Sequence, residues 1–327
     1  MPLVNGRDLL LLAFKEGRAI GAFNASNMEM VQAIIWAAEE ASKDLGEPVD
    51  VIIQVSPGAV KYAGWNLAAG IVKIAAAKTD VRVALNLDHA TEVEQIKRAI
   101  EEGFTSVLFD GSSLPLEENI RLTRQVVEIC HAKGVPVEAE ISKIPKIEDY
   151  FTKSEIAHLR YLPPAEVVKI IRGRVSRSLE ELMTKPDEAE YFVKKTKCDF
   201  LAVSFGSIHG MWDDILPIRL DRLIAIKERV RIPLVSHGSS GILMTSEDAK
   251  NKGITLSEGE GTLVDAIKFG GVTKVNVATA LSIAFIEGFI EAWKNNPSEK
   301  DFRNLGENAR NKVKEKAKRY IKIFAGK

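Results

Sequence analysis

The chain has 327 residues, of which 46% are hydrophobic, so it can bury a large core as one barrel or as two smaller domains. Lys plus Arg and Asp plus Glu number 45 each, which argues against nucleic acid or an anionic membrane surface as a partner. No segment reaches the ~20 apolar residues of a membrane span, and the N-terminal stretch does not resemble a signal peptide. A cytoplasmic location is therefore expected. Cys130 and Cys198 lack metal-ligand spacing and are expected to be buried small apolar residues.

Short runs rich in Val, Ile, Leu and Ala alternate with longer amphipathic stretches, as in parallel strands joined by crossover helices. Most of these runs lack polar alternation, which is typical of strands buried on both faces. Eight runs occur, at Gly21–Ala25, Val49–Ser56, Arg82–Asp88, Ser106–Ser112, Val135–Ile141, Asp199–Phe205, Ile232–His237 and Val272–Thr279. They predict an α/β fold, a (β/α)8 TIM barrel that residues 1–327 form as a single domain.

Helical signals fill the gaps between the strands. Met28–Lys43 follows Asn27, a residue type that caps helix N-termini, and Leu116–Lys133 ends in a basic turn followed by Gly134. A helical tail is expected from about residue 298, where Lys and Arg recur at helical spacing and indicate a solvated helix face.

Two connections are longer than an ordinary βα unit. They span residues 141–197 and 238–271, and each begins where a predicted strand has just ended. Long loops are therefore expected there, over the face of the barrel where such enzymes do their chemistry.

Three of the five histidines follow the carboxyl ends of predicted strands. They are His89, His209 and His237, whereas His131 and His158 lie in predicted helix or loop and are interpreted as surface residues. One histidine at such a place is more often structural, but three from separate strands converge on one rim of a barrel. A divalent ion that is bound by three neutral imidazoles and keeps further coordination positions open is typical of a catalytic metal site.

Carboxylates gather at the same rim. Asp88 precedes His89, Asp110 ends the fourth strand, and Glu138 and Glu140 lie two apart on the fifth. Charges at the ends of apolar strands are costly unless they are paired or bind metal. A salt bridge to the surrounding helices is the alternative for each of them alone, but Glu138 and Glu140 point the same way, so that one could reach the metal and the other support it.

Small residues follow the histidines, in Gly210, in 238–241 and around 276–279. The seventh and eighth strands of a barrel often provide a phosphate cradle of backbone N–H groups there. This signal is weak by itself, because glycine after a strand is ordinary turn chemistry.

With these motifs in place, the chain resembles the class II, metal-dependent fructose- and tagatose-bisphosphate aldolases over its whole length. The last matching stretch looks more like the tagatose branch. The matching stretches, in chain order, are 22–29, 54–59 with Tyr62, 87–89, 103–112, 137–140, 199–210, 232–238 and 274–279.

The resemblance implies a metal such as Zn²⁺ held by His89, His209 and His237, with Glu140 as a further ligand, and it leaves open whether a monovalent cation assists. Such a metal would polarise the carbonyl of a dihydroxyacetone-phosphate unit. Asp88 would be the general acid/base at the hydroxyl that loses its proton on cleavage.

Further roles follow from the same resemblance. Glu148, on the loop after the fifth strand, would exchange a proton with the donor carbon. Asn24, Ser56 and Asn276 would contact the substrate, and Gly210, Gly238, Ser240 and Thr279 would bind a phosphate. Arg303 matches a tail arginine that in relatives reaches a phosphate, in some of them across a subunit boundary.

The chain departs from the family pattern at several of these places. Asn86 replaces the first histidine of a usual His-Leu-Asp-His pattern, and a lysine near the phosphate is replaced by Asp213, which would repel an anion. Ser142, Pro145 and Lys146 stand in place of glycines in the catalytic loop. Ser239 replaces a glycine near the phosphate, and Ala280 replaces an acid. The loop is therefore expected to close differently.

The resemblance predicts an aldehyde-lyase of carbohydrate metabolism that acts on a small sugar phosphate, by default fructose 1,6-bisphosphate, giving dihydroxyacetone phosphate and glyceraldehyde 3-phosphate. Tagatose 1,6-bisphosphate or another, less phosphorylated substrate is the alternative. A metal-dependent hydrolase and a catalytically silent sugar-phosphate-binding barrel also stay open, although Asn86 removes the His-x-His pair that a hydrolase would favour. Relatives suggest a homodimer or homotetramer.

Overall fold

The computed structural model describes residues 3–326 and contains a closed barrel of eight parallel strands. Neighbouring strands follow one another round the barrel in the order β1-β10-β8-β6-β5-β4-β3-β2. All eight predicted strands are present, which confirms the (β/α)8 barrel. They are β1 (Ile20–Asn24), β2 (Asp50–Val55), β3 (Arg82–Ala90), β4 (Ser106–Asp110), β5 (Val137–Glu140), β6 (Phe200–Ala202), β8 (Leu234–Ser236) and β10 (Val272–Val277).

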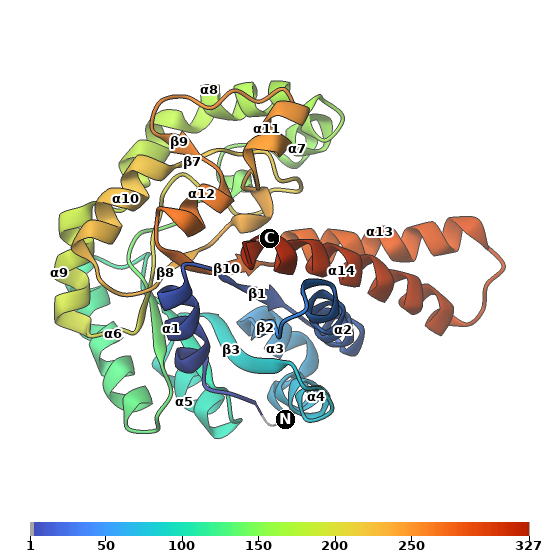
Figure 1. The fold of residues 1–327 in the computed structure, drawn as a ribbon, viewed down its shortest axis with the longest axis horizontal. Helices are drawn as coiled ribbons and strands as arrows, with labels where there is room; N and C mark the ends of the chain where they lie inside the picture. Colours follow the sequence, from blue (N-terminus) through green and yellow to red (C-terminus); the bar gives the residue numbers. More distant parts are fainter. Residues whose placement is uncertain (1–2, 327) are drawn as a thin grey trace.

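Helices surround the barrel (Figure 1). They are α1 (Gly6–Glu16), α2 (Met28–Leu45), α3 (Pro57–Ala63), α4 (Trp65–Ala76), α5 (Val93–Glu101), α6 (Leu116–His131), α7 (Lys153–Leu159), α8 (Pro164–Leu182), α9 (Pro186–Thr196), α10 (Leu220–Arg229), α11 (Ser246–Asn251), α12 (Leu263–Lys268), α13 (Thr279–Asn295) and α14 (Phe302–Phe324). The predicted cap of α2 is confirmed, because the Asn27 side chain accepts a hydrogen bond from the N–H of Met30. The described part of the chain contains no helix long and apolar enough to cross a bilayer.

The barrel interior changes from apolar to polar along the strands. Its amino-terminal end is filled by an apolar cluster to which α1 contributes Leu9, Leu10 and Ala13. Along β2, apolar Ile52 is followed two residues later by Gln54, and along β3, Ala84 is followed by Asn86. Because alternate residues of a strand point the same way, the polar groups collect toward the carboxyl ends of the strands.

The long connections are mostly helical, so the expectation of long loops was wrong in part. Residues 141–197 contain the 3-10 turn η1 (Ile147–Asp149) and three helices, α7 to α9. Apolar residues at helical spacing in α8, among them Val167, Ile171 and Val175, pack in a second core with Ile208 of the segment after β6. The connection 238–271 contains η2 (Ser239–Gly241), α11, α12 and β9 (Glu260–Gly261), which pairs antiparallel with β7 (Ile218–Arg219).

The carboxyl-terminal helices α13 and α14 lie side by side and extend away from the barrel (Figure 1). One face of α14 is buried, including Val313, Ala317 and Phe324, while its charged face reaches α2. There, Lys314 and Lys318 both pair with Glu40 of α2. The basic residues of the tail are thus only partly solvated, since several of them join the two helices.

Candidate metal centre and active site

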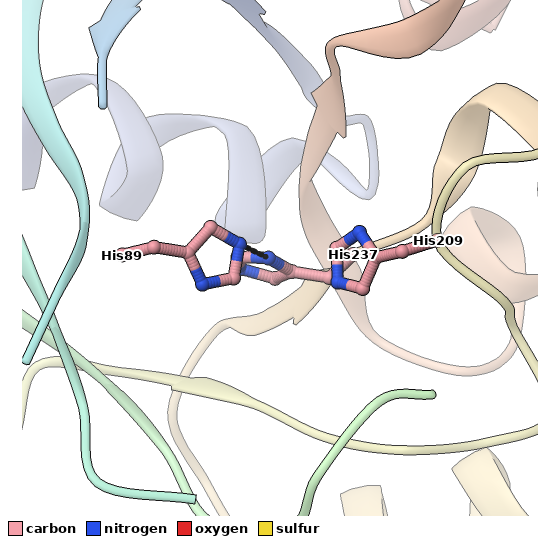
Figure 2. Close-up of side chains that lie close together, drawn as sticks. All are labelled: His89, His209 and His237. Carbon is pink, nitrogen blue, oxygen red and sulfur yellow. Dashed lines mark hydrogen bonds between the residues drawn. The ribbon is translucent and has the colours of Figure 1, made fainter. Parts of the chain in front are cut away.

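His89, His209 and His237 meet at the carboxyl ends of the strands (Figure 2). One ligand nitrogen of each lies within 4.8 Å of the others. The ring centroids of His89 and His237 are 4.8 Å apart, and the His209 ring lies 5.4 Å from that of His89 and 6.0 Å from that of His237. The prediction that these three imidazoles converge is therefore confirmed.

Hydrogen bonds fix the orientation of two of the rings. His89 Nδ1 lies 2.9 Å from an oxygen of Asp110, and His237 Nε2 lies 2.8 Å from an oxygen of the buried Glu138. When each carboxylate accepts the N–H of its imidazole, the other nitrogens, His89 Nε2 and His237 Nδ1, face each other with lone pairs at 3.1 Å. Two facing lone pairs repel unless a cation binds both, so this donor set fits a metal ion.

Burial and neighbouring charges shift the pKa values of His89 and His209 in opposite directions. Burial opposes the charged form of His89, but the nearby Asp88 carboxylate and the bond to Asp110 raise its pKa to about 10, so a metal ion would have to displace a proton from this imidazole. Burial, together with the repulsion that His89 and His237 exert when they are protonated, lowers the pKa of His209 to about 3. The His209 imidazole is therefore neutral, as a metal ligand must be.

Glu140 is poised as a further ligand. Its Oε2 atom is buried without a hydrogen-bond partner, at 3.9 Å from His89 Nδ1 and 3.8 Å from His237 Nδ1. Burial raises the pKa of this carboxyl to about 7. Since a buried, unpartnered carboxylate oxygen is costly, a cation beside Glu140 would relieve the cost. A second cluster with metal-ligand geometry contains His89, Asp110 and Glu140.

A bulge in β3 sets the direction of Asp88 and His89. Leu87 pairs with Val107 and Ala90 with Phe109, so β3 carries one residue more than β4 across this interval. His89 adopts φ 50°, a conformation that is uncommon for a non-glycine residue. The bulge turns the end of the strand so that two consecutive side chains serve the site.

A buried ionic network lies below the imidazoles, and sequence reasoning did not identify it. Lys274 is 1% exposed and donates to Glu138 Oε2 at 2.6 Å and to Gln54 Oε1 at 2.8 Å. The charge of Lys274 and the bond to His237 hold the pKa of Glu138 below its usual value despite burial. Glu138 therefore stays ionised and can accept the His237 N–H. A lysine inside the otherwise apolar strand β10 was the feature of the sequence that could have revealed this network. Among the described residues, Lys274 is its only cation other than an imidazole.

Asp88 combines burial with one free oxygen. Its Oδ2 accepts a hydrogen bond of 2.8 Å from the Asn24 amide, whereas its buried Oδ1 has no partner. Burial opposes ionisation, but the charges of His89, His237 and Lys274 lower the pKa of Asp88. Asn24 in turn accepts from Gln54, so the amide that holds Asp88 is itself fixed.

A cavity of about 550 Å³ opens over the metal-binding cluster, and His89, Glu140, Glu148 and His209 are among its lining residues. Glu148 packs against the backbone of Gly210, where an added Cβ would lie 3.1 Å from its Oε2 atom. Gly210 has φ +82°, so a side chain there would be strained as well as crowded.

The loop after β5, which departs from the family at Pro145 and Lys146, is attached to the His209 segment. The His209 N–H donates to the Pro145 carbonyl at 2.8 Å, and the Ile147 N–H donates to the His209 carbonyl at 2.9 Å. These bonds form a parallel bridge between Lys146 and His209. The side chains that replace glycines thus leave the loop docked beside the cavity.

Several predicted phosphate contacts also come together. The Ser240 hydroxyl of η2 accepts a hydrogen bond of 3.1 Å from the N–H of Ala280, next to Thr279 at the start of α13. Thr279 and Gly210 both line the cavity, and Gly238, with φ 66°, precedes η2. Asn276 contacts the His237 ring, with its amide nitrogen 2.9 Å from His237 Nε2.

Three other predicted or suspected residues have partners outside the metal-binding cluster. Ser56 uses its hydroxyl to cap α3, where it accepts from the N–H of Ala59. Arg303 lies at the start of α14, exposed and paired with Asp301 at 2.6 Å, and this chain does not bring it to its own three histidines. Asp213 pairs with Lys252 at 3.0 Å, so its charge is partly compensated and repels an anion less than the sequence suggested.

Comparison with known proteins agrees with this geometry. A family model described as "Fructose-bisphosphate aldolase class-II" matches residues 4–327. The chain is 36% identical to a fructose-bisphosphate aldolase of Helicobacter pylori strain J99, and the match covers 98% of each chain. It is 30% identical to a protein of Alkalicoccus urumqiensis named sulfofructosephosphate aldolase, over 99% of this chain and 97% of that one.

A solved structure gives the same result. The YdjI aldolase from Escherichia coli K12 superposes with a TM-score of 0.73 at 30% identity, over 98% of this chain and 97% of the other. The full-length family match, the two relatives and this structure confirm the resemblance inferred from short motifs. The chain therefore belongs to the class II fructose-bisphosphate aldolase family, a family of metal-dependent lyases.

Proposed function

We propose that this enzyme cleaves and forms fructose 1,6-bisphosphate, with dihydroxyacetone phosphate and glyceraldehyde 3-phosphate as the products of cleavage. The observation that carries the proposal is the meeting of three imidazoles beside a buried aspartate with one unpartnered oxygen. Aldol cleavage needs an electrophile at the ketone and a base at the neighbouring hydroxyl: the three imidazoles would hold a metal that acts as the electrophile, and Asp88 would be the base.

The metal would be Zn²⁺, bound by His89, His209 and His237, with Glu140 as a fourth or alternative ligand. Nitrogen and carboxylate donors with an open position suit catalytic zinc. When bound, the ion supplies Lewis acidity to the substrate ketone. The carboxylates Asp110 and Glu138 fix the imidazole tautomers that face it.

Protons would be moved by two carboxylates. Asp88, oriented by Asn24, takes the proton of the substrate hydroxyl through its free Oδ1 and returns it in the synthetic direction. Glu148, which lines the same cavity beside Gly210, exchanges a proton with the donor carbon after the carbon–carbon bond has broken.

Backbone groups around Gly210, Gly238, Ser240 and Thr279 would bind a phosphate. The hydrogen bond between Ser240 and Ala280 joins two of these segments, and Thr279 begins a 17-residue helix whose N–H groups favour an anion. Asn276 and Ser56 would contact the sugar.

The active unit would be a homodimer or homotetramer in which Arg303 of one copy reaches the phosphate of another. Arg303 is the second residue of α14, which begins at the far end of the α13–α14 pair (Figure 1). One face of α13 supports association, because Ile286, Phe289, Ile290 and Trp293, spaced as on a single helical stripe, are between 39% and 55% exposed.

An alternative substrate is kept open by one relative. The A. urumqiensis protein is named sulfofructosephosphate aldolase, so a sulfofructose phosphate is a further sugar to test. Tagatose 1,6-bisphosphate is the second sugar to compare.

The test is cleavage of each of these sugars by the zinc-loaded protein, before and after chelation. We expect cleavage of fructose 1,6-bisphosphate to stop on chelation and to return when Zn²⁺ is restored. Unchanged cleavage without metal would contradict the mechanism, and a zinc-loaded protein that cleaves none of the sugars would favour the silent barrel. Glu148→Gln should abolish proton exchange into dihydroxyacetone phosphate, while the protein still binds zinc.

A further inference from the structure

Lys146 occupies a position where the resemblance expects glycine, and the structure holds it next to a metal ligand. The two backbone hydrogen bonds between the loop and His209 flank Lys146 on either side, at Pro145 and Ile147. The Lys146 N–H is itself bonded to Asp149 at 3.0 Å, so the turn that carries the lysine is fixed from both directions. This backbone is thus preorganised, and only the side chain of Lys146 has to adapt.

The side chain of Lys146 is exposed and lines the cavity over the metal-binding cluster. Among the described residues, no carboxylate is paired with the Lys146 ammonium. The lysine therefore presents an uncompensated positive charge to whatever enters the cavity.

The charges around the cavity make this lysine important for a phosphorylated ligand. Asp110, Glu140 and Glu148 line the cavity and would repel a phosphate. The described residues that line the cavity include two lysines, Lys143 and Lys146. Lys143 lies 3.6 Å from Asp149, so part of its charge is already compensated.

We propose that Lys146 is the specificity-determining cation of this enzyme, which binds the phosphate of the dihydroxyacetone-phosphate unit beside Gly210 and Thr279. The inference rests on the proposed aldolase function. From the loop after β5, Lys146 supplies a cation that offsets the carboxylates Asp110, Glu140 and Glu148 of the same cavity. The loop thereby couples substrate binding to the placement of Glu148, two residues further on.

The test is direct binding of dihydroxyacetone phosphate to the zinc-loaded protein, measured by calorimetric titration. Lys146→Gln should raise the dissociation constant about tenfold or more, because an ammonium contact to phosphate is lost. Lys146→Arg should restore binding to within about threefold of the unchanged protein, since it keeps the charge. Zinc content should be the same in all variants.

Two lysines serve as matched controls. Lys143→Gln removes a cavity lysine that is already paired, and Lys153→Gln removes the same charge at the start of α7. Both should bind dihydroxyacetone phosphate within about twofold of the unchanged protein. The inference is overturned if Lys146→Gln binds as well as the unchanged protein, or if Lys143→Gln weakens binding as much.

Cleavage assays on the same proteins separate this inference from the proposed function. If the unchanged protein binds dihydroxyacetone phosphate through Lys146 but cleaves no ketose bisphosphate, the inference stands and the proposed function fails. If cleavage occurs and Lys146→Gln leaves both KM and the dissociation constant unchanged, the function stands and the inference fails.

Discussion

At the scale of single residues, the site depends on which nitrogen of each imidazole carries the proton. Asp110 and Glu138 each take one N–H, which leaves His89 Nε2 and His237 Nδ1 for a cation. Lys274 maintains these tautomers indirectly, because its ammonium keeps Glu138 ionised in the barrel interior. Lys274 is thus a positioning residue that acts on the metal through two others.

Lys274→Met should therefore weaken both folding and zinc binding. The change leaves the Glu138 carboxylate buried without its cation, a loss of about 3–5 kcal/mol in the free energy of unfolding. The loss of an outer partner of a metal ligand typically costs about 10–100-fold in metal affinity. Urea denaturation and zinc competition with a chelator measure the two effects.

The double variant Lys274→Met with Glu138→Gln provides the control, because it removes both charges. It should recover much of the stability, but not the zinc affinity, since the His237 N–H loses its carboxylate. Equal stability of the single and double variants would show that the ionic pair does not matter to folding.

The two cysteines make a prediction about reactivity. Burial raises the pKa of the Cys130 and Cys198 thiols to about 12, so very little thiolate is present near neutral pH. A thiol-specific dye at pH 8 should label neither residue in the folded protein and both after unfolding in urea. Rapid labelling of the folded protein would mean that the cysteines are more accessible than the structure has them.

At the scale of elements, strand ends and the segments after them carry the site, and contacts from elsewhere hold them in place. Asp214, in the segment after β6, is 1% exposed and accepts hydrogen bonds from Tyr320 at 2.7 Å and from Arg319 at 2.8 Å. Both donors belong to α14. The last helix therefore fixes the segment that also carries His209.

Tyr320→Phe should lower the free energy of unfolding by about 1–3 kcal/mol, because a buried carboxylate loses one donor while the aromatic packing is kept. Tyr161→Phe is the control, since Tyr161 is 88% exposed and its change should have almost no effect. Thermal denaturation of the two variants tests the expectation. If both melt like the unchanged protein, α14 does not stabilise this segment through Tyr320.

At the scale of the whole molecule, the α13–α14 pair is the part that the barrel leaves partly uncovered. Its exposed apolar stripe is larger than scattered single residues and faces away from the core. In the oligomer that we propose, Arg303 in the first turn of α14 would reach the active site of another copy.

Ile290→Glu should break this association, because it places a charge in the middle of the apolar stripe. Sedimentation velocity should show a dimer or tetramer for the unchanged protein and a smaller species for the variant. Ile74→Glu is the control on α4, where the residue is 63% exposed outside the stripe. A monomeric unchanged protein would refute the proposed assembly.

The pattern of residues along the chain was enough to predict the strands of the barrel, the cap of α2 and the meeting of three histidines. These features are local: hydrophobic periodicity and capping depend on neighbouring residues, and a parallel barrel then brings every strand end to one rim. The family followed from short motifs in the right order.

The remaining features depend on contacts between residues that are far apart in the chain. The bulge at His89, the pairing of Lys274 with Glu138 and the bridge between Lys146 and His209 join residues from separate strands or loops. The long connections became helices because apolar faces such as that of α8 found partners in the segment after β6. Whether a charge is paired, and which imidazole nitrogen is free, depends on neighbours in space that a pattern along the chain does not specify.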